Sequence, residues 1–210
     1  WYAFIKNLKY IVVDEAHIYR GVFGSHVANV IRRLVRLCRL FGIVPQFILC
    51  SATISNPGEH AAKLVGKEFH VIQWDGSPSG GKDFVFWNPP RIEQGKDARK
   101  STNTESAALF AELIKSKVRS LAFVRSRKAA ELVYLYSRDH LSLSDFADID
   151  RIRPYRASYL PEERRNIERD LMSGQLLGVT TTNALELGVD IGYIDAVVIV
   201  GYPGTIASTW

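Results

Sequence analysis

The sequence has 210 residues, of which 47% are apolar and 23% are charged, a balance typical of globular proteins and unlike disordered or collagen-like chains. At about 150 residues per domain, this length allows one or two domains. Lysine and arginine together exceed aspartate and glutamate by five, which permits a polyanionic partner without requiring one. No apolar run approaches the roughly 20 residues that span a bilayer, so we expect no membrane partner.

The first residue is Trp1 and the only methionine is Met172. Because an unprocessed gene product starts with methionine, we expect the chain to be a piece of a longer protein. The two cysteines, Cys38 and Cys50, lie in apolar surroundings without CxxC spacing. Two buried thiols in a cytosolic protein are favoured over a disulfide.

Short apolar runs alternate with helical patterns along the chain. Six of these runs have the length of a strand, at residues 10–13, 47–50, 84–87, 121–124, 176–179 and 196–200. They are apolar on both faces, as is typical of parallel strands buried between helices. Helical periodicity or helix end signals predict helices at residues 25–41, 104–117, 126–140 and 161–173. Ser25 is the predicted N-cap of the first helix and Gly42 its stop. This alternation predicts an α/β fold.

One segment, residues 88–103, breaks the alternation. It contains two consecutive prolines, a glycine and six charged residues, without apolar periodicity. Such a composition is typical of a linker. We therefore predict two α/β units, residues 1–87 and residues 104–210.

The sharpest chemical feature is the run Asp14-Glu15-Ala16-His17, which follows a predicted buried strand. In open α/β sheets, ligands bind at the carboxyl ends of the strands. A carboxylate there, Asp14, can hold Mg²⁺ against nucleotide phosphates, directly or through water. The neighbouring Glu15 can orient and deprotonate an attacking water. These four residues alone leave open the alternative of an acidic surface turn.

A second polar run follows the predicted strand at residues 47–50. This run is Ser51-Ala52-Thr53, and its hydroxyls would lie at the same edge of the sheet as His17. They could hydrogen-bond the histidine and relay a change of state. An ordinary Ser/Thr turn is the alternative.

A third polar run, Thr180-Thr181-Thr182-Asn183, follows the predicted strand at residues 176–179. Hydroxyls and backbone N–H groups at a helix start suit a phosphate of a nucleic-acid backbone. Gly188 and Asp190 come shortly after, and Asp190 could accept a hydrogen bond from a ribose hydroxyl. A capped helix with a turn glycine is the alternative.

Together, these three runs resemble motifs II, III and V of superfamily 2 helicases in order and spacing. Other stretches are similar to the mitomycin-repair-factor branch, the RecQ4-like DEAD/DEAH DNA helicases, at residues 19–26, 75–78, 86–90 and 201–204. The resemblance implies two RecA-like parallel-sheet units, the first truncated at its N-terminus and the second at its C-terminus.

The resemblance also implies ATP and Mg²⁺ as cofactors. Asp14 would hold Mg²⁺ through water, and Glu15 would activate the hydrolytic water. The third catalytic residue, His17, would couple them to the residues Ser51, Ala52 and Thr53. The nucleotide itself would be approached by Gly188 and Asp190.

The implied partner is single-stranded DNA, or DNA with a single-stranded tail. Its backbone would contact Thr182 and Asn183, together with Arg125 and Ser126 of a motif IV-like stretch. Solvated surface charge is an equal alternative for Arg125. We expect the arginines between residues 32 and 39 to form a solvated helix face rather than a DNA site.

Two family features are missing from the 210 residues: the phosphate-cradling loop G-x-x-x-x-G-K-[ST] and the arginine motif Q-x-x-G-R-x-G-R. An arginine finger contributes about 10³–10⁵ in rate in nucleotide hydrolases. We therefore expect the parent protein to be an ATP-dependent DNA helicase or translocase of DNA repair, moving 3′ to 5′ by resemblance. The 210-residue chain alone should be inactive.

Two alternatives remain at this point. One is a non-catalytic nucleic-acid-binding module that keeps the RecA-like fold. The other is an unrelated Mg²⁺-dependent hydrolase that uses Asp14 and Glu15, which leaves the stretch from Thr182 to Asp190 unexplained. For the helicase, the expected location is the cytoplasm, with the nucleoid, in a prokaryote and the nucleus in a eukaryote.

Overall fold

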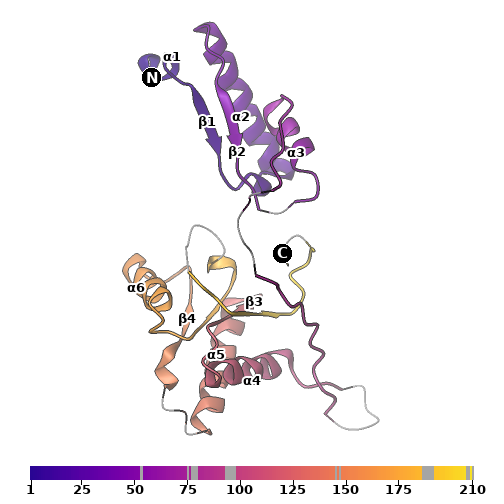
Figure 1. Ribbon diagram of the computed structural model, residues 1–210, viewed down its shortest axis with the longest axis vertical. Helices are drawn as coiled ribbons and strands as arrows, with labels where there is room; N and C mark the ends of the chain where they lie inside the picture. The colour runs from indigo at the N-terminus through magenta and orange to yellow at the C-terminus, as the bar shows by residue number, and fades with distance from the viewer. Residues whose placement is uncertain are drawn as a thin grey trace. The chain divides into compact units, whose positions relative to one another are not determined.

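The structure, a computed structural model, describes residues 1–52, 54–74, 76, 80–92, 98–144, 146, 148–185, 192–206 and 209. The chain divides into two compact units, residues 1–82 and residues 83–209 (Figure 1). Each unit contains parallel strands connected by helices, which confirms the predicted α/β class. The linker at residues 88–103 stays a prediction.

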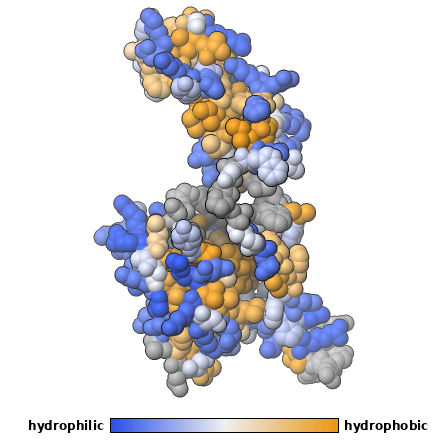
Figure 2. Space-filling model, viewed as in Figure 1, coloured by the Kyte–Doolittle hydropathy of each residue, from blue (hydrophilic) through white to orange (hydrophobic). Residues whose placement is uncertain are grey.

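The first unit is built on a two-stranded parallel sheet, β1 (Tyr10–Val13) and β2 (Gln46–Leu49). Its helices are α1 (Tyr2–Lys6), α2 (Gly21–Leu40) and α3 (Pro57–Val65), with a short 3₁₀ turn, η1 (Ala16–Ile18), after β1. One face of the sheet packs against α2 and α3 in a core that includes Ile31, Phe47 and Leu64. The other face leaves Tyr10 and Val12 exposed, and hydrophobic surface is visible on this unit in Figure 2.

The second unit holds a four-stranded parallel sheet in the order β4-β5-β3-β6. The strands are β3 (Ser120–Val124), β4 (Ile152–Tyr155), β5 (Gly178–Thr181) and β6 (Ala196–Val200). Helices α4 (Thr102–Lys115) and α5 (Arg127–Ser142) form one core with the sheet, around Phe110 and Val133. Helix α6 (Pro161–Met172) forms a second core with it through Ile167 and Leu171. Two 3₁₀ turns, η2 (Ile149–Arg151) and η3 (Asn183–Leu185), complete the unit.

Most predicted strands form, and the exceptions have physical reasons. The strand predicted at residues 176–179 forms two residues later, because Thr180 and Thr181 are completely buried and continue it. The strand predicted at residues 84–87 is wrong, since these residues form no strand and expose half or more of each side chain. The pattern does not predict β4, in which Arg153 and Pro154 interrupt the apolar run. An edge strand tolerates a proline because one side of it makes no ladder hydrogen bonds.

The helix predicted at residues 25–41 starts four residues earlier, at Gly21, so Ser25 is not its N-cap. Arg20 holds that position, and Ser25 Oγ donates a hydrogen bond to the carbonyl oxygen of Gly21 at 3.0 Å. Apolar periodicity misses the first turn because its buried residue, Gly24, has no side chain to count. The other predicted helices form as α4, α5 and α6, whereas α1 and α3 were not predicted. No helix within the described residues is long and apolar enough to cross a membrane.

The substitution Gly24→Ala tests the close approach of α2 to the turn after β1. An added Cβ would lie 2.2 Å from the carbonyl oxygen of Tyr19. Because that atom belongs to the backbone, the helix or the turn must shift. We expect the free energy of unfolding to fall by about 1–3 kcal/mol, although alanine is the better helix former.

Urea denaturation measures this change. Ser25→Ala, one residue further along the same helix, is the control and should stay within about 0.5 kcal/mol of the unaltered protein. Equal stability of the two variants would contradict the close contact.

Candidate functional site

The turns that follow β1 and β2 are held side by side by backbone hydrogen bonds. Cys50 N–H donates to the carbonyl oxygen of Val13 at 3.0 Å, and Ala16 N–H donates to the carbonyl oxygen of Cys50 at 2.9 Å. These bonds continue the strand pairing beyond the sheet. The turn of residues 14–17 therefore lies against the turn that begins at Ser51, as the rule for parallel strands predicts.

The backbone of the first turn is strained at Glu15. Its φ of 49° lies in the left-handed region, which costs a non-glycine residue about 1–3 kcal/mol. The next residue, Ala16, is buried and bonded on both sides: its N–H to Cys50, and its carbonyl oxygen to His60 Nε2 at 2.8 Å. Those contacts hold the strained turn in place.

Sequence patterns did not find His60, which lies on α3. A carbonyl oxygen only accepts hydrogen bonds, so the contact to Ala16 requires a proton on His60 Nε2. The residue lies 44 positions from its partner, and no spacing rule connects the two. The feature of the sequence that could have pointed to His60 is the proline in the first turn of α3, which is typical of a helix start.

The two carboxylates differ in their surroundings. Asp14 is exposed, and its Oδ1 accepts a hydrogen bond from Glu15 N–H at 2.8 Å, which leaves Oδ2 available. Within the described part of the chain, no group of three or more His, Cys, Asp or Glu side chains could hold a metal ion. Mg²⁺ commonly takes one or two carboxylates and completes its shell with water and substrate phosphates. The single carboxylate of Asp14 fits that mode of binding.

His17 connects the first turn to the second. Its Nδ1 lies 3.4 Å from the backbone nitrogen of Ala52 and 3.4 Å from Glu15 Oε2. The two contacts require opposite states of Nδ1: the Ala52 N–H needs it unprotonated, whereas the carboxylate needs it protonated. His17 can therefore satisfy only one of them at a time.

The predicted contacts of His17 with the second turn form only in part. The contact runs to the backbone of Ala52, while the Ser51 hydroxyl donates to the carbonyl oxygen of Ala52 at 2.8 Å. Thr53 lies outside the described residues. The roles of these three residues in coupling stay a prediction.

In the second unit, the predicted DNA-contacting residues gather at one edge. Strands β3 and β5 are parallel neighbours, so Arg125 and Ser126 after β3 lie at the same sheet edge as Thr182 and Asn183 after β5. Arg125 and Asn183 are exposed. A guanidinium, hydroxyls and an amide at one edge can donate several hydrogen bonds to phosphate oxygens.

The hydroxyls at this edge also have local partners. Ser126 Oγ accepts from Ala129 N–H at 3.1 Å and caps α5. Thr182 Oγ1 accepts from Ala184 N–H at 3.4 Å. A hydroxyl that accepts locally can still donate outward. Two further predicted residues, Gly188 and Asp190, lie outside the described residues.

The segment between β4 and β5 is anchored through Tyr155 at the end of β4. The side chain is buried, and its hydroxyl donates to Glu168 of α6 at 2.6 Å. Burial, followed by the hydrogen bond to Glu168, raises the pKa of Tyr155 above its usual value of 10. Tyr155 is therefore a neutral donor at pH 7, and it ties β4 to α6.

The run from Gly76 to Lys82 comes near the phosphate-loop pattern, with the spacing G-x-x-x-x-G-K, but it continues with Asp83 in place of serine or threonine. A phosphate loop joins a strand to a helix. The described residues on either side, 70–74 and 80–90, form neither. This run therefore lacks both the hydroxyl and the helix start that bind Mg²⁺ and phosphate.

Two protein families match the chain. Residues 1–60 match the DEAD/DEAH box helicases, and residues 105–210 match the helicase conserved C-terminal domain. The chain therefore belongs to the DEAD/DEAH-box helicases, which confirms the family predicted from its motifs.

Within this family the chain is similar to three relatives. The ATP-dependent helicase YprA of Bacillus subtilis (strain 168) is 50% identical over 210 residues, which are 100% of this chain and 28% of YprA. The ATP-dependent helicase HRQ1 of Saccharomyces cerevisiae is 44% identical, over 99% of this chain and 20% of HRQ1. The crystal structure of the DUF1998 helicase MrfA bound to DNA and AMPPNP matches with a TM-score of 0.90 at 50% identity, over 100% of this chain and 29% of MrfA. These matches confirm the RecA-like fold.

The substitution His60→Ala tests whether α3 holds the turn of residues 14–17. It leaves the buried carbonyl oxygen of Ala16 without this donor, which should lower the free energy of unfolding by about 1–3 kcal/mol. Hydrogen–deuterium exchange should also become faster in this turn. The exposed His70, changed to alanine, is the matched control. If both variants exchange at the rate of the unaltered protein, His60 does not hold the turn.

Proposed function

We propose that the chain supplies the DEAH-box segment and the C-terminal helicase segment of an ATP-dependent DNA helicase or translocase. The observation that carries this proposal is the pair of turns after β1 and β2, in which His17 lies between Glu15 and the Ala52 backbone. The names of YprA and HRQ1 describe ATP-dependent helicases, and MrfA was crystallised with DNA and AMPPNP. The chain spans less than a third of the length of each of these relatives.

In this function, Asp14 would hold Mg²⁺ together with water and nucleotide phosphates. The bound ion would neutralise charge on the phosphates. Glu15 would orient the attacking water and take its proton. Gly188 and Asp190 are proposed to approach the nucleotide, because they match the family motif.

His17 is suited to link this chemistry to the second turn. When Nδ1 is unprotonated it accepts from the Ala52 N–H, and when Nδ1 is protonated it can pair with Glu15. A change in the charge or position of Glu15 would therefore change the hold on the Ala52 backbone. This gives Ser51, Ala52 and Thr53 their proposed coupling role.

The proposed DNA site of the second unit consists of Arg125, Ser126, Thr182 and Asn183. These side chains would bind the sugar-phosphate backbone rather than the bases, since phosphate contacts position a nucleic acid without reading its sequence. Single-stranded DNA, or a single-stranded tail, is the proposed substrate, with 3′ to 5′ movement and a role in repair. The proposed location is the nucleoid of a prokaryote or the nucleus of a eukaryote.

Glu15→Gln in the full-length protein tests the general base. The amide keeps the size of the side chain but cannot take a proton, so DNA-stimulated ATP hydrolysis should fall by about 10²–10⁴. Binding of a fluorescent ATP analogue should be unchanged. Glu68→Gln, at an exposed position of the same unit, should hydrolyse ATP normally. Normal turnover of Glu15→Gln would refute the assignment of Glu15 as base.

The purified 210-residue chain provides a second test. Because its sequence contains neither the phosphate loop nor the arginine motif, we expect no DNA-stimulated ATPase activity and no tight ATP binding. Circular dichroism would show whether the sample is folded. Measurable DNA-stimulated hydrolysis by a folded sample would contradict the expectation and indicate phosphate-binding groups elsewhere in the chain.

A further inference from the structure

The entire positive excess of the chain lies in its first unit. Residues 1–82 contain ten lysines and arginines against five aspartates and glutamates, whereas residues 83–210 contain 17 of each. Four of the ten cations belong to one helix, α2: Arg32, Arg33, Arg36 and Arg39. The excess is therefore concentrated rather than spread over the surface.

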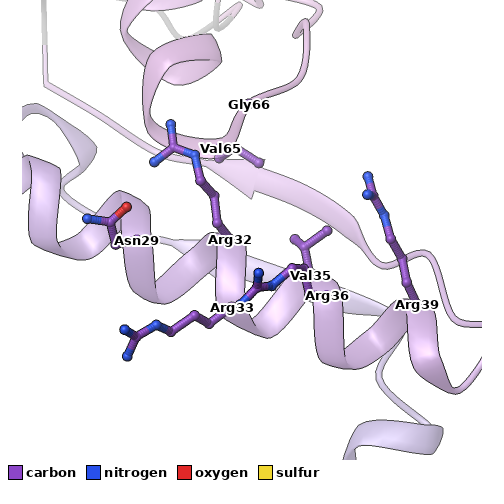
Figure 3. A pocket seen from close by; sticks show the side chains of 8 residues that line it. All are labelled: Asn29, Arg32, Arg33, Val35, Arg36, Arg39, Val65 and Gly66. Carbon is purple, nitrogen blue, oxygen red and sulfur yellow. The ribbon is translucent and has the colours of Figure 1, made fainter.

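The four arginines line a hollow between α2 and the end of α3 (Figure 3). Its volume is about 600 Å³, and the remaining lining residues are Asn29, Val35, Val65 and Gly66. Arg32 reaches toward α3, where its Nη2 donates to the carbonyl oxygen of Lys63 at 3.1 Å. Arg39 extends on the same side of α2, about two turns further along. We call these eight residues the α2 arginine groove.

The stability of α2 does not account for this cluster. Arg36 lies four residues after Arg32 and three before Arg39, and like charges at these spacings on a helix repel each other. Helix α2 contains no acidic residue. All four arginines are exposed, and no acidic side chain among the described residues forms an ion pair with any of them. A bound anion would relieve this repulsion.

We propose that the α2 arginine groove binds the phosphates of a nucleic-acid backbone. A guanidinium group can donate two parallel hydrogen bonds to one phosphate. Arg32 and Arg39 are seven residues apart, or roughly 10 Å along the helix axis, so the groove suits a repeating anion better than a single small one. The two apolar lining residues, Val35 and Val65, are buried, so the groove offers a peptide no exposed apolar side chain.

The groove is a second place of contact, separate from the turn of residues 14–17. Helix α2 starts at Gly21, close after that turn, and then runs away from it. Arg32 and Arg39 follow Gly21 by 11 and 18 residues, which places them roughly 16 and 27 Å along the axis. The inference rests on the proposed function only in taking nucleic acid as the polyanion, and it adds a contact on a different surface.

The double variant R36A/R39A of the full-length protein tests the groove. The probes are a labelled 30-nucleotide single strand and the same strand as the tail of a duplex, titrated by fluorescence anisotropy between 50 and 200 mM salt. Each lost phosphate contact lowers the slope of log affinity against log salt by about 0.7–0.9. The variant should therefore lose roughly tenfold less affinity across this salt range than the unaltered protein.

The matched control is R165A/R169A, which removes two exposed arginines from α6, a helix that carries four acidic residues. Its salt slope should be unchanged. R36K/R39K keeps both charges and should keep most of the slope. If R36A/R39A loses ATPase activity through misfolding, the single variants R36A and R39A replace it, each with about half the change in slope.

Equal slopes for R36A/R39A and R165A/R169A, in proteins that bind DNA, would overturn the groove and leave the proposed function intact. A second outcome would also overturn the proposal: the unaltered protein and R165A/R169A bind poly-glutamate, R36A/R39A does not, and the DNA salt slopes are unchanged. That result would assign the groove to an acidic polypeptide. If the unaltered protein binds neither DNA probe, the proposed function fails and the groove proposal fails with it.

Discussion

Parallel strand pairing is the constraint on which the rest of this structure depends. Parallel strands cannot be joined by a tight hairpin, so each pair requires a crossover, and here helices form most of the crossover segments. The crossover places the end of each strand at the same edge of the sheet. In the first unit, the pairing extends past the strands through Cys50, and this extension brings residues 14–17 against Ser51 and Ala52. The polar side chains meet because the backbone ladder continues for one more step.

The same constraint explains how much of the fold could be predicted. The pairing needs apolar strands, and β1, β2, β3 and β6 were visible as short apolar runs. Where burial is achieved by other means, the pattern fails. Thr180 and Thr181 are buried although they carry hydroxyls, Gly24 is buried without a side chain, and Pro154 lies in an edge strand. Conversely, residues 84–87 are apolar yet exposed. The strand predicted there fails because an apolar run does not show whether a neighbouring strand is available to pair with it.

The candidate site divides in the same way. The residues that follow the strands could be named from the sequence, since each motif is local and strand ends converge. The contacts between motifs could not. In the second turn, the group that His17 contacts is the backbone N–H of Ala52, and a backbone group cannot be read from the residue type. The hydrogen bond of His60 joins positions 44 residues apart, which requires knowing how α3 packs. The arginines of α2 were expected to be a solvated face, and only their placement beside α3 shows that they line a hollow.

The strained conformation of Glu15 has a consequence for how variable this position can be. Glycine would adopt a φ of 49° at less cost, yet it would remove the carboxylate and give the chain freedom to leave the turn. Glutamate at this position supplies the carboxylate but must adopt an unfavourable left-handed backbone conformation. The hydrogen bonds of the neighbouring Ala16 therefore stabilise this unfavourable conformation. If they were weakened, the turn would relax and the carboxylate of Glu15 would move with it.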